Sequence, residues 1–266
     1  MTDNSPLVRE FMEKGRSESC PIIDTHAHFG PFQGIYFPTV TAEDMIATMD
    51  RCGVQKLVFS SHASLIDPRR GNPISREACA KYPDRLYAYW SINPNYPELI
   101  PDDLAKFEHE PHFVGFKFLA SYQKYPITGD NYTPVYEYAN AHRCIILSHT
   151  WGGNSFCGPV QVEEVVKKYP DMTFLMGHSL SGAWDDAFRI ANDYPNAYLE
   201  LCGICHHGGV IERMCEVVGS HKITFGTDLP WFDPHYGMGC VLFSHITDED
   251  IHNILHRNAE RLFGWQ

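Results

Sequence analysis

The sequence predicts a (β/α)8 barrel, the TIM-barrel class, because short apolar runs alternate with amphipathic segments along the 266 residues. The runs are rich in β-branched and aromatic residues, as buried parallel strands are. One barrel takes about 250 residues, so the length suits a single domain over 1–266 with an N-terminal extension over 1–20. The eight runs cover 21–28, 56–61, 85–92, 112–119, 144–150, 172–179, 197–203 and 222–228.

Helix signals fill the spaces between these runs. The segment 41–53 begins with Thr41 and an acidic first turn and ends at Gly53, which is typical of a capped helix. The segment 159–170 begins with proline, and 248–265 carries one apolar stripe. A doubly wound open sheet is the alternative, but no glycine-rich phosphate loop follows an early strand. Further helical segments are expected at about 72–82, 97–108, 132–142, 183–194 and 208–219.

The charge balance limits the partners. The chain has 21 Lys+Arg and 33 Asp+Glu, for a formal net charge of −12. An acidic surface argues against nucleic acid or an anionic membrane as the main partner, although a small anionic substrate needs only local positive charge. We therefore expect a small-molecule substrate, no nucleic-acid partner and no membrane partner, and a homo-oligomer stays open.

The N-terminal segment has no apolar leader, and no run reaches the ~18 apolar residues of a membrane span. Nine cysteines are scattered along the chain, and the short-spaced pair Cys202 and Cys205 is weak support for zinc or redox chemistry. Reduced thiols and a cytoplasmic location are the prediction.

Ligand-type side chains end several of the predicted strands. The carboxyl ends of all strands in such a barrel meet at one mouth, so these side chains should share a small volume. Imidazole and carboxylate ligands suit Zn²⁺, with Fe²⁺, Mn²⁺ or Ni²⁺ as alternatives. They are His26 and His28 on the first run, Lys117 on the fourth, His149 on the fifth, His178 on the sixth and Asp228 on the eighth.

Each of these residues alone has an ordinary structural explanation. A single histidine among 15 is commonly a surface or core residue, and His62 is interpreted in that way. Asp228 alone could cap a helix, and Lys117 alone could extend its ammonium group to water. Their joint placement at one predicted face favours a metal site.

Six motifs occur in order along the chain: "DTHAHFG", "GFKFL", "ILSHT", "LMGHS", "FGTDLPW" and "NAERLFGW". With them the sequence, from about Ile22 to Trp265, resembles the amidohydrolase superfamily. It is most similar to the amidohydrolase-related branch, which contains metal-dependent hydrolases, lactonases and non-oxidative decarboxylases such as aminocarboxymuconate semialdehyde decarboxylase.

The resemblance implies roles for the residues at the strand ends. His26, His28 and His149 would bind metal, and Asp228 would bind metal and accept a proton from its water. His178 would bind metal or lie just beyond it and orient the water. Lys117 would either be carboxylated and bridge two ions or, unmodified, hold a substrate oxygen.

The leading expectation is a hydrolase of a small amide, ester or lactone. One zinc ion, with two left open, would lower the pKa of its bound water, Asp228 and His178 would move the proton, and Lys117 would stabilise the oxyanion. The alternative is a metal-dependent non-oxidative decarboxylase, and the compact chain favours hydrolysis slightly. A non-catalytic metal-binding scaffold is a third possibility, and the Asp228–His178 pair argues against it.

Loops after the strands should carry specificity. Arginines can meet a substrate carboxylate, and aromatic side chains can form pocket walls, although loop packing explains each residue singly. We expect a pocket for a small cyclic or carboxylated molecule. The candidate substrate-binding residues are Arg69, Arg70, Tyr122, Trp151, His207 and Trp231.

Asp24 lies two residues before His26 and should face the barrel interior below the metal. A buried carboxylate needs a partner, so we expect Lys117 or a backbone donor beside it.

Overall fold

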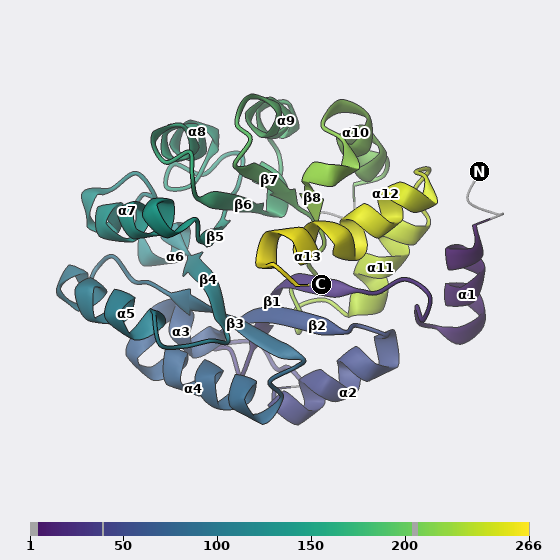
Figure 1. Ribbon diagram of the computed structural model, residues 1–266, viewed down its shortest axis with the longest axis horizontal. Coiled ribbons are helices and arrows are strands. Elements are labelled where there is room, and N and C mark those ends of the chain that lie inside the picture. Colours follow the sequence, from purple (N-terminus) through teal and green to yellow (C-terminus); the bar gives the residue numbers. More distant parts are fainter. Residues whose placement is uncertain (1–4, 39, 204–206, 266) are drawn as a thin grey trace.

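Eight parallel strands form one sheet in which each strand pairs with the next in sequence (Figure 1). The computed structural model describes residues 5–38, 40–203 and 207–265. Seven strands lie inside the predicted runs, and β1 extends one residue beyond its run, so the predicted barrel is confirmed. The strands are β1 Ile23–Phe29, β2 Lys56–Ser61, β3 Leu86–Ser91, β4 Phe113–Phe118, β5 Ile145–His149, β6 Thr173–Gly177, β7 Ala197–Glu200 and β8 Ile223–Thr224.

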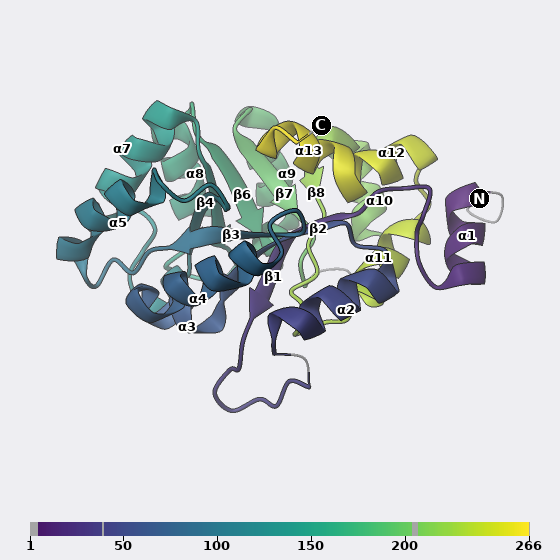
Figure 2. The same cartoon turned by 60° about the horizontal axis from the view of Figure 1, so that its bottom comes forward.

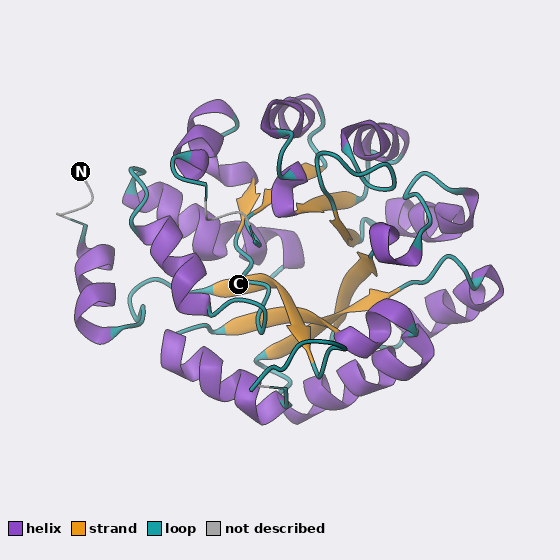
Figure 3. Ribbon diagram, turned by 180° about the vertical axis from the view of Figure 1, so that it is seen from behind, coloured by secondary structure: helices purple, strands orange, loops and turns teal. Residues whose placement is uncertain are grey.

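Helices surround the strands, as the view from behind shows most clearly (Figure 3). They are α1 Pro6–Lys14, α2 Ala42–Cys52, α3 His62–Ile66, α4 Pro68–Lys81, α5 Ile100–Phe107, α6 Ala120–Gln123, α7 Thr133–His142, α8 Pro159–Lys168, α9 Trp184–Asp193, α10 Val210–Val217, α11 Pro234–Leu242, α12 Asp248–His252 and α13 Asn258–Phe263. Short helical turns are η2 Pro97–Leu99, η3 Asp130–Tyr132, η4 His178–Leu180, η5 Ser220–Lys222 and the π-helical turn η6 Asn253–Arg257.

The sequence signals account for α2 in detail. Thr41 and Asp44 form a reciprocal capping box, and Gly53 ends the helix at φ 84°. The expected continuous helix over 248–265 is corrected: η6 interrupts it between α12 and α13. Helices α1, α3, α6 and α11 were not expected, because they are short or lie in segments that were interpreted as extension and loops.

The barrel is closed by the segment after β8 rather than by β8 itself, which has only two residues. Thr25 donates a backbone hydrogen bond to Phe225 O, and Asp228 donates one to His26 O, both at 2.8 Å. This closure places Asp228 beside the first strand, with φ 64°. Positive φ is uncommon outside glycine, and such backbone is concentrated at functional sites.

One end of the barrel interior is apolar. Val58, Tyr89, Leu147 and Leu175 form a buried cluster, and Phe263 of α13 packs against it. Because strand residues two apart face the same side, His149 follows Leu147 on the inner face and lies nearer the other end. The barrel therefore has an apolar base covered by α13 and a polar mouth.

The loop after β1 projects from the molecule on the side away from α13 (Figure 2). In the N-terminal extension, α1 buries Leu7 and Val8 against the main core. No helix in the described ranges is both long and apolar enough to cross a membrane.

Candidate metal centre

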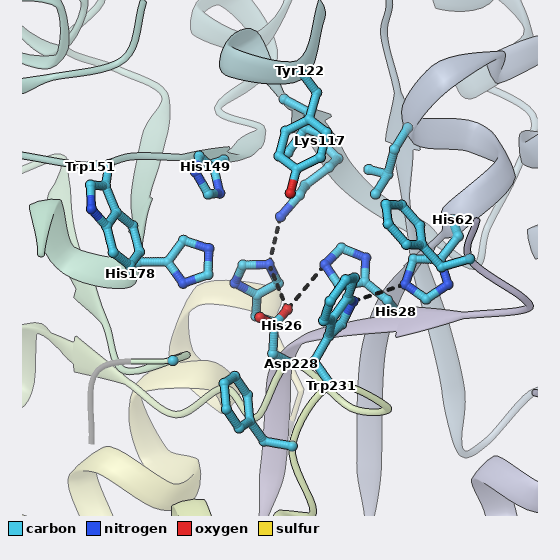
Figure 4. Close-up of a pocket in the computed structure, with 15 residues that line it drawn as sticks. His26, His28, His62, Lys117, Tyr122, His149, Trp151, His178, Asp228 and Trp231 are labelled. Carbon is cyan, nitrogen blue, oxygen red and sulfur yellow. Dashed lines mark hydrogen bonds and ion pairs between the residues drawn. The ribbon is translucent and has the colours of Figure 1, made fainter. Parts of the chain in front are cut away.

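The six predicted side chains of the metal site line one cavity at the mouth, of about 240 Å³ (Figure 4). They come from β1, β4, β5, the turn after β6 and the segment that closes the barrel. The shared cavity is what the strand-end argument predicted. These residues are His26, His28, Lys117, His149, His178 and Asp228.

Two of the imidazoles are oriented by hydrogen bonds at Nδ1. His26 Nδ1 lies 2.8 Å from Glu200 Oε2, and His178 Nδ1 lies 2.8 Å from the carbonyl oxygen of Cys202. An acceptor at Nδ1 fixes the proton there and leaves the Nε2 lone pair for the cavity. Carboxylates and carbonyls hold metal-binding histidines in this way.

His28 follows the same pattern and makes the strongest case for a cation. Its Nδ1 faces the carbonyl oxygen of Ser60 at 3.2 Å, while its Nε2 lies 3.1 Å from Asp228 Oδ1. If His28 is neutral and donates from Nδ1, the lone pair of its Nε2 faces a lone pair of Asp228 Oδ1. The buried Asp228 Oδ1 accepts no hydrogen bond from the described residues. A proton or a metal ion between these atoms removes the conflict, so the donor set fits a divalent metal.

Burial sets the protonation of this group. It lowers the pKa of His26, His149 and His178, so these imidazoles are neutral and their lone pairs are available. Burial acts to raise the pKa of Asp228, but the neighbouring His28 holds it well below its usual range. Neutral imidazoles and an ionised carboxylate are the states that bind a metal.

Lys117 is fully buried and reaches the same centre. Its Nζ lies 2.6 Å from His26 Nε2, and burial lowers the pKa of this amine to about 8. It is the only lysine or arginine among the described residues that line the cavity. The position fits either role implied by the resemblance, a carboxylated bridge or a partner for a substrate anion.

Glu200, at the end of β7, was missed by the sequence analysis. Besides the contact with His26, its carboxylate accepts backbone hydrogen bonds from His178 and Cys202. A methyl group on Gly226 would collide with Glu200 and with His26 Cβ, so the close approach requires glycine. The signal was a carboxylate inside the apolar run "AYLELCG", where burial demands a partner.

Asp24 has the backbone partners expected for it. Oδ1 accepts from the backbone N–H of His26 at 3.0 Å and of Thr227 at 3.1 Å, and the Thr227 hydroxyl donates to Oδ2. Lys117 contacts His26 instead. Burial raises the pKa of Asp24 to about 7.

His62 lines the cavity, although it was interpreted as an ordinary surface or core residue. Its Nδ1 lies 2.6 Å from the carbonyl oxygen of Gly30, and its Nε2 accepts from Trp231 Nε1 at 3.0 Å. Burial lowers the pKa of His62 to about 4. With both nitrogens engaged, neutral His62 fixes the indole of Trp231 rather than binding metal.

Three of the six predicted substrate-binding residues line the cavity. Tyr122, Trp151 and Trp231 form aromatic walls, and Phe32 and Phe232, which are not among the six candidates, extend them. The ring centroid of Tyr122 lies 6.2 Å from that of His149, and Figure 4 shows Trp151 beside His178. The aromatic pocket is therefore larger than the sequence analysis anticipated.

The other three lie away from this cavity. Arg69 is exposed at the start of α4, where its Nε donates to Asp67 Oδ1 at 2.9 Å. Arg70 is exposed on the same turn, and His207 packs against Trp184 with ring centroids 5.5 Å apart. The positions of these residues in the loop sequences did not reveal which neighbours their side chains contact. Cys205 lies outside the described residues.

A family model described as "Amidohydrolase" matches residues 23–265. The chain belongs to the amidohydrolase family. This match supports an enzyme of that superfamily and confirms the resemblance drawn from the motifs. Among curated proteins, none matches the chain.

Solved structures with the same fold cover 92% of this chain at 14–18% identity. A 2,6-dihydroxybenzoate decarboxylase from Rhizobium has 17% identity, a TM-score of 0.76 and 99% of its own chain covered. A dihydroxybenzoic acid decarboxylase from a Polaromonas species, with bound manganese and 2-nitroresorcinol, has 18% identity, a TM-score of 0.75 and 97% covered. A 5-carboxyvanillate decarboxylase from Novosphingobium aromaticivorans, complexed with manganese and 4-hydroxy-3-methoxy-5-nitrobenzoic acid, has 14% identity, a TM-score of 0.73 and 96% covered.

Proposed function

We propose that this chain is a metal-dependent, non-oxidative decarboxylase of a small aromatic or unsaturated carboxylic acid. The observation that carries the proposal is the cavity itself, in which aromatic walls surround a set of imidazole and carboxylate ligands and one buried lysine. Similar solved structures are decarboxylases of hydroxylated aromatic acids, which supports this reaction over the hydrolysis favoured by the compact chain.

The metal ligands in this proposal are His26, His28, His149 and Asp228, with His178 beside them. When bound, the metal would polarise the substrate and neutralise its negative charge. Zinc suits this nitrogen-rich set, and the manganese in two of the similar structures supports a broader divalent preference.

Substrate binding falls to the rest of the cavity. Trp151 and Trp231 offer flat apolar surfaces for a ring, and the Lys117 ammonium group offers a positive charge for a carboxylate or phenolate oxygen. A cavity of about 240 Å³ has room for one small ring. The burial of Lys117 at the floor of this cavity strengthens its attraction for an anion.

The reaction needs one proton. The bond between the carboxylate and the ring carbon breaks, its electron pair stays on that carbon, CO2 leaves, and a proton replaces the carboxylate. Asp228 Oδ1 and His178 Nε2 face the cavity and are the proton-transfer groups proposed here. The proton comes from water, and the hydroxide that is left combines with CO2 as bicarbonate. Because the electron pair of the broken bond stays on the ring carbon, no oxidant or reductant is required.

Hydrolysis of a small amide, ester or lactone is the second candidate. Family membership and the Asp228–His178 pair favour it, since the same two groups can move a proton from a metal-bound water to a leaving group.

Isotope labelling separates the two reactions. The purified enzyme would be offered hydroxybenzoic acids, unsaturated acids, lactones and aryl amides in heavy water and in oxygen-18 water. Decarboxylation predicts CO2 release and deuterium at the carbon that lost the carboxylate. Oxygen-18 in a new product carboxylate, without CO2, would establish hydrolysis instead.

The preferred metal is tested on the same enzyme. Metal-depleted protein would be reconstituted separately with zinc and with manganese, and turnover would be compared at equal occupancy. We expect both to restore activity, while full activity without any metal would contradict the proposal.

A further inference from the structure

A second group of metal-ligating side chains lies at the base of the barrel. The ligand atoms of Cys20, His252 and His256 are all within 4.8 Å of one another. Cys20 precedes the start of β1, while His252 ends α12 and His256 lies in η6. Strand β1 runs from this end toward the mouth, so the base group is separate from the candidate metal centre. Figure 1 shows α12 on the same side of the barrel as α1.

Two of the three spacings between the ligand atoms are close to those around one zinc ion. Cys20 Sγ lies 3.3 Å from His252 Nδ1, which lies 3.0 Å from His256 Nε2. With zinc–sulfur and zinc–nitrogen bonds of about 2.3 and 2.0–2.1 Å in a tetrahedron, neighbouring ligand atoms stand about 3.3–3.6 Å apart. For these two pairs, shifts of a few tenths of an ångström would suffice, and the third pair of ligand atoms lies within 4.8 Å.

Helical spacing presents the two imidazoles together. His252 and His256 are four residues apart, so they occupy one face of the helix. The π-helical turn η6 begins between them, and such turns are frequent at functional sites. Cys20 meets this face from the segment between α1 and β1.

The charges around the base group favour a cation. His256 Nδ1 lies 3.0 Å from Glu260 Oε1, which places a carboxylate beside the imidazole, although this buried nitrogen makes no hydrogen bond with the described residues. Burial raises the pKa of the Cys20 thiol to about 12; the positive charge of Arg257 opposes this rise, and the negative charges of Glu10, Glu260 and Asp248 add to it. A metal ion bound to Cys20 Sγ would instead lower the pKa of the thiol and deprotonate it.

We propose that Cys20, His252 and His256 bind a second zinc ion, with water in the fourth position beside the half-buried His252. The ion would tie the segment before β1 to the last helices. Because zinc takes the thiolate, one proton leaves Cys20 on binding.

The base group also has an explanation without metal. His252 Nδ1–H can donate to His256 Nε2, and the Cys20 thiol lies 3.5 Å from the carbonyl oxygen of Pro21. These hydrogen bonds are the alternative that the experiment must exclude.

A similar trio at Cys52, Asp233 and His235 is a weaker candidate. His235 Nε2 lies 2.7 Å from the carbonyl oxygen of Gly15, His235 Nδ1 lies 2.8 Å from Asp233, and Asp233 also pairs with Arg51. Its donors are therefore already engaged.

Cobalt substitution reads out the thiolate directly. Metal-depleted full-length protein would be titrated with Co²⁺ and followed in the near ultraviolet, where thiolate-to-cobalt charge transfer absorbs. We expect a band in the wild type and its loss in Cys20→Ser. The band should persist in Cys79→Ser, a matched buried thiol, and in Cys202→Ser, whose thiol lies near His26 and His178 at the mouth.

Zinc content supplies the second measurement. Cys20→Ser and His252→Asn should each hold one zinc fewer per chain than wild type, and turnover should be unchanged because neither residue touches the cavity. His252→Asn keeps the test decisive if Cys20→Ser folds poorly.

Absence of the band in wild type, or its loss only in Cys202→Ser, would overturn the proposal. Equal zinc content in wild type and His252→Asn would do the same and would establish the hydrogen-bonded arrangement.

Discussion

The Glu200 carboxylate accepts a hydrogen bond from His26 Nδ1 across 2.8 Å in the buried wall of the mouth. Two strands distant in sequence, β1 and β7, are joined by this contact. It fixes which nitrogen of His26 faces the cavity, so we expect Glu200 to control metal affinity without binding the metal itself.

Glu200→Gln replaces the carboxyl group that His26 Nδ1 contacts while keeping the shape of the side chain. Metal affinity should fall about 10- to 100-fold, as for other carboxylates that support metal-binding histidines. Competition with a chromophoric chelator measures the change. Glu163→Gln, which alters an exposed pair with Arg189, is the matched control and should leave affinity unchanged. Equal affinities for the two variants would contradict this role.

Asp228→Asn tests the charge at the barrel-closing segment. Asparagine tolerates positive φ, so the backbone at 64° is preserved while the carboxylate is lost. Turnover should fall about 10²- to 10⁴-fold, the range typical of a lost proton-transfer group. Steady-state kinetics at matched metal occupancy measure it, and a loss of less than about tenfold would remove Asp228 from proton transfer.

Lys117→Met separates the two roles left open for the lysine. Methionine is similar in length, uncharged and cannot be carboxylated. Since Lys117 is the only lysine or arginine lining the described cavity, we expect unchanged metal content and a large loss of turnover on an anionic substrate. Lys124→Met, on the exposed end of α6, is the control. A fall from two metal equivalents to one would establish a bridging carboxylated lysine instead.

Trp231→Ala removes an aromatic wall that His62 holds in place. A missing apolar surface should raise KM about 10- to 100-fold with a smaller change in kcat. Arg69→Ala and Arg70→Ala should leave KM within about twofold, because both side chains are exposed and outside the cavity. If only the arginine variants bind the substrate more weakly, the carboxylate-binding site expected in that loop would be supported instead.

His62 makes stability depend on pH. Its pKa falls from 6.5 to about 4 on folding, so the folded protein binds fewer protons than the unfolded chain between these values. The contribution, at most about 3 kcal/mol, is present above pH ~6.5 and is lost as the pH falls toward ~4. His62→Gln should therefore flatten the loss of unfolding free energy between about pH 6.5 and 4, as measured by urea titration. His142→Gln, at the exposed end of α7, should not; equal slopes for both variants would contradict the assignment.

The sequence anticipated much of the site because barrel topology turns sequence position into spatial position. His26, His149, His178 and Asp228 end different strands, and parallel strands bring their carboxyl ends together. No contact between these residues had to be known in advance.

Contacts that depend on side-chain packing were harder to predict from the sequence. Glu200 and His62 acquire their roles from atoms supplied by other strands and loops, His26 for one and Trp231 for the other. Arg69 was expected at the substrate site, but Asp67, two residues earlier in the same turn, accepts a hydrogen bond from its guanidinium group instead.

The sequence by itself determined the eight-strand barrel, the mouth at which the ligands gather and the family to which the chain belongs. These follow from periodicity, strand order and short motifs, all of which are local properties of the chain. Only the tertiary structure decided which imidazole nitrogen faces the cavity, which aromatic rings form its walls, and that Cys20 meets His252 and His256 at the base. Those features depend on distances of about 3 Å between residues far apart in sequence, and such distances are set by packing.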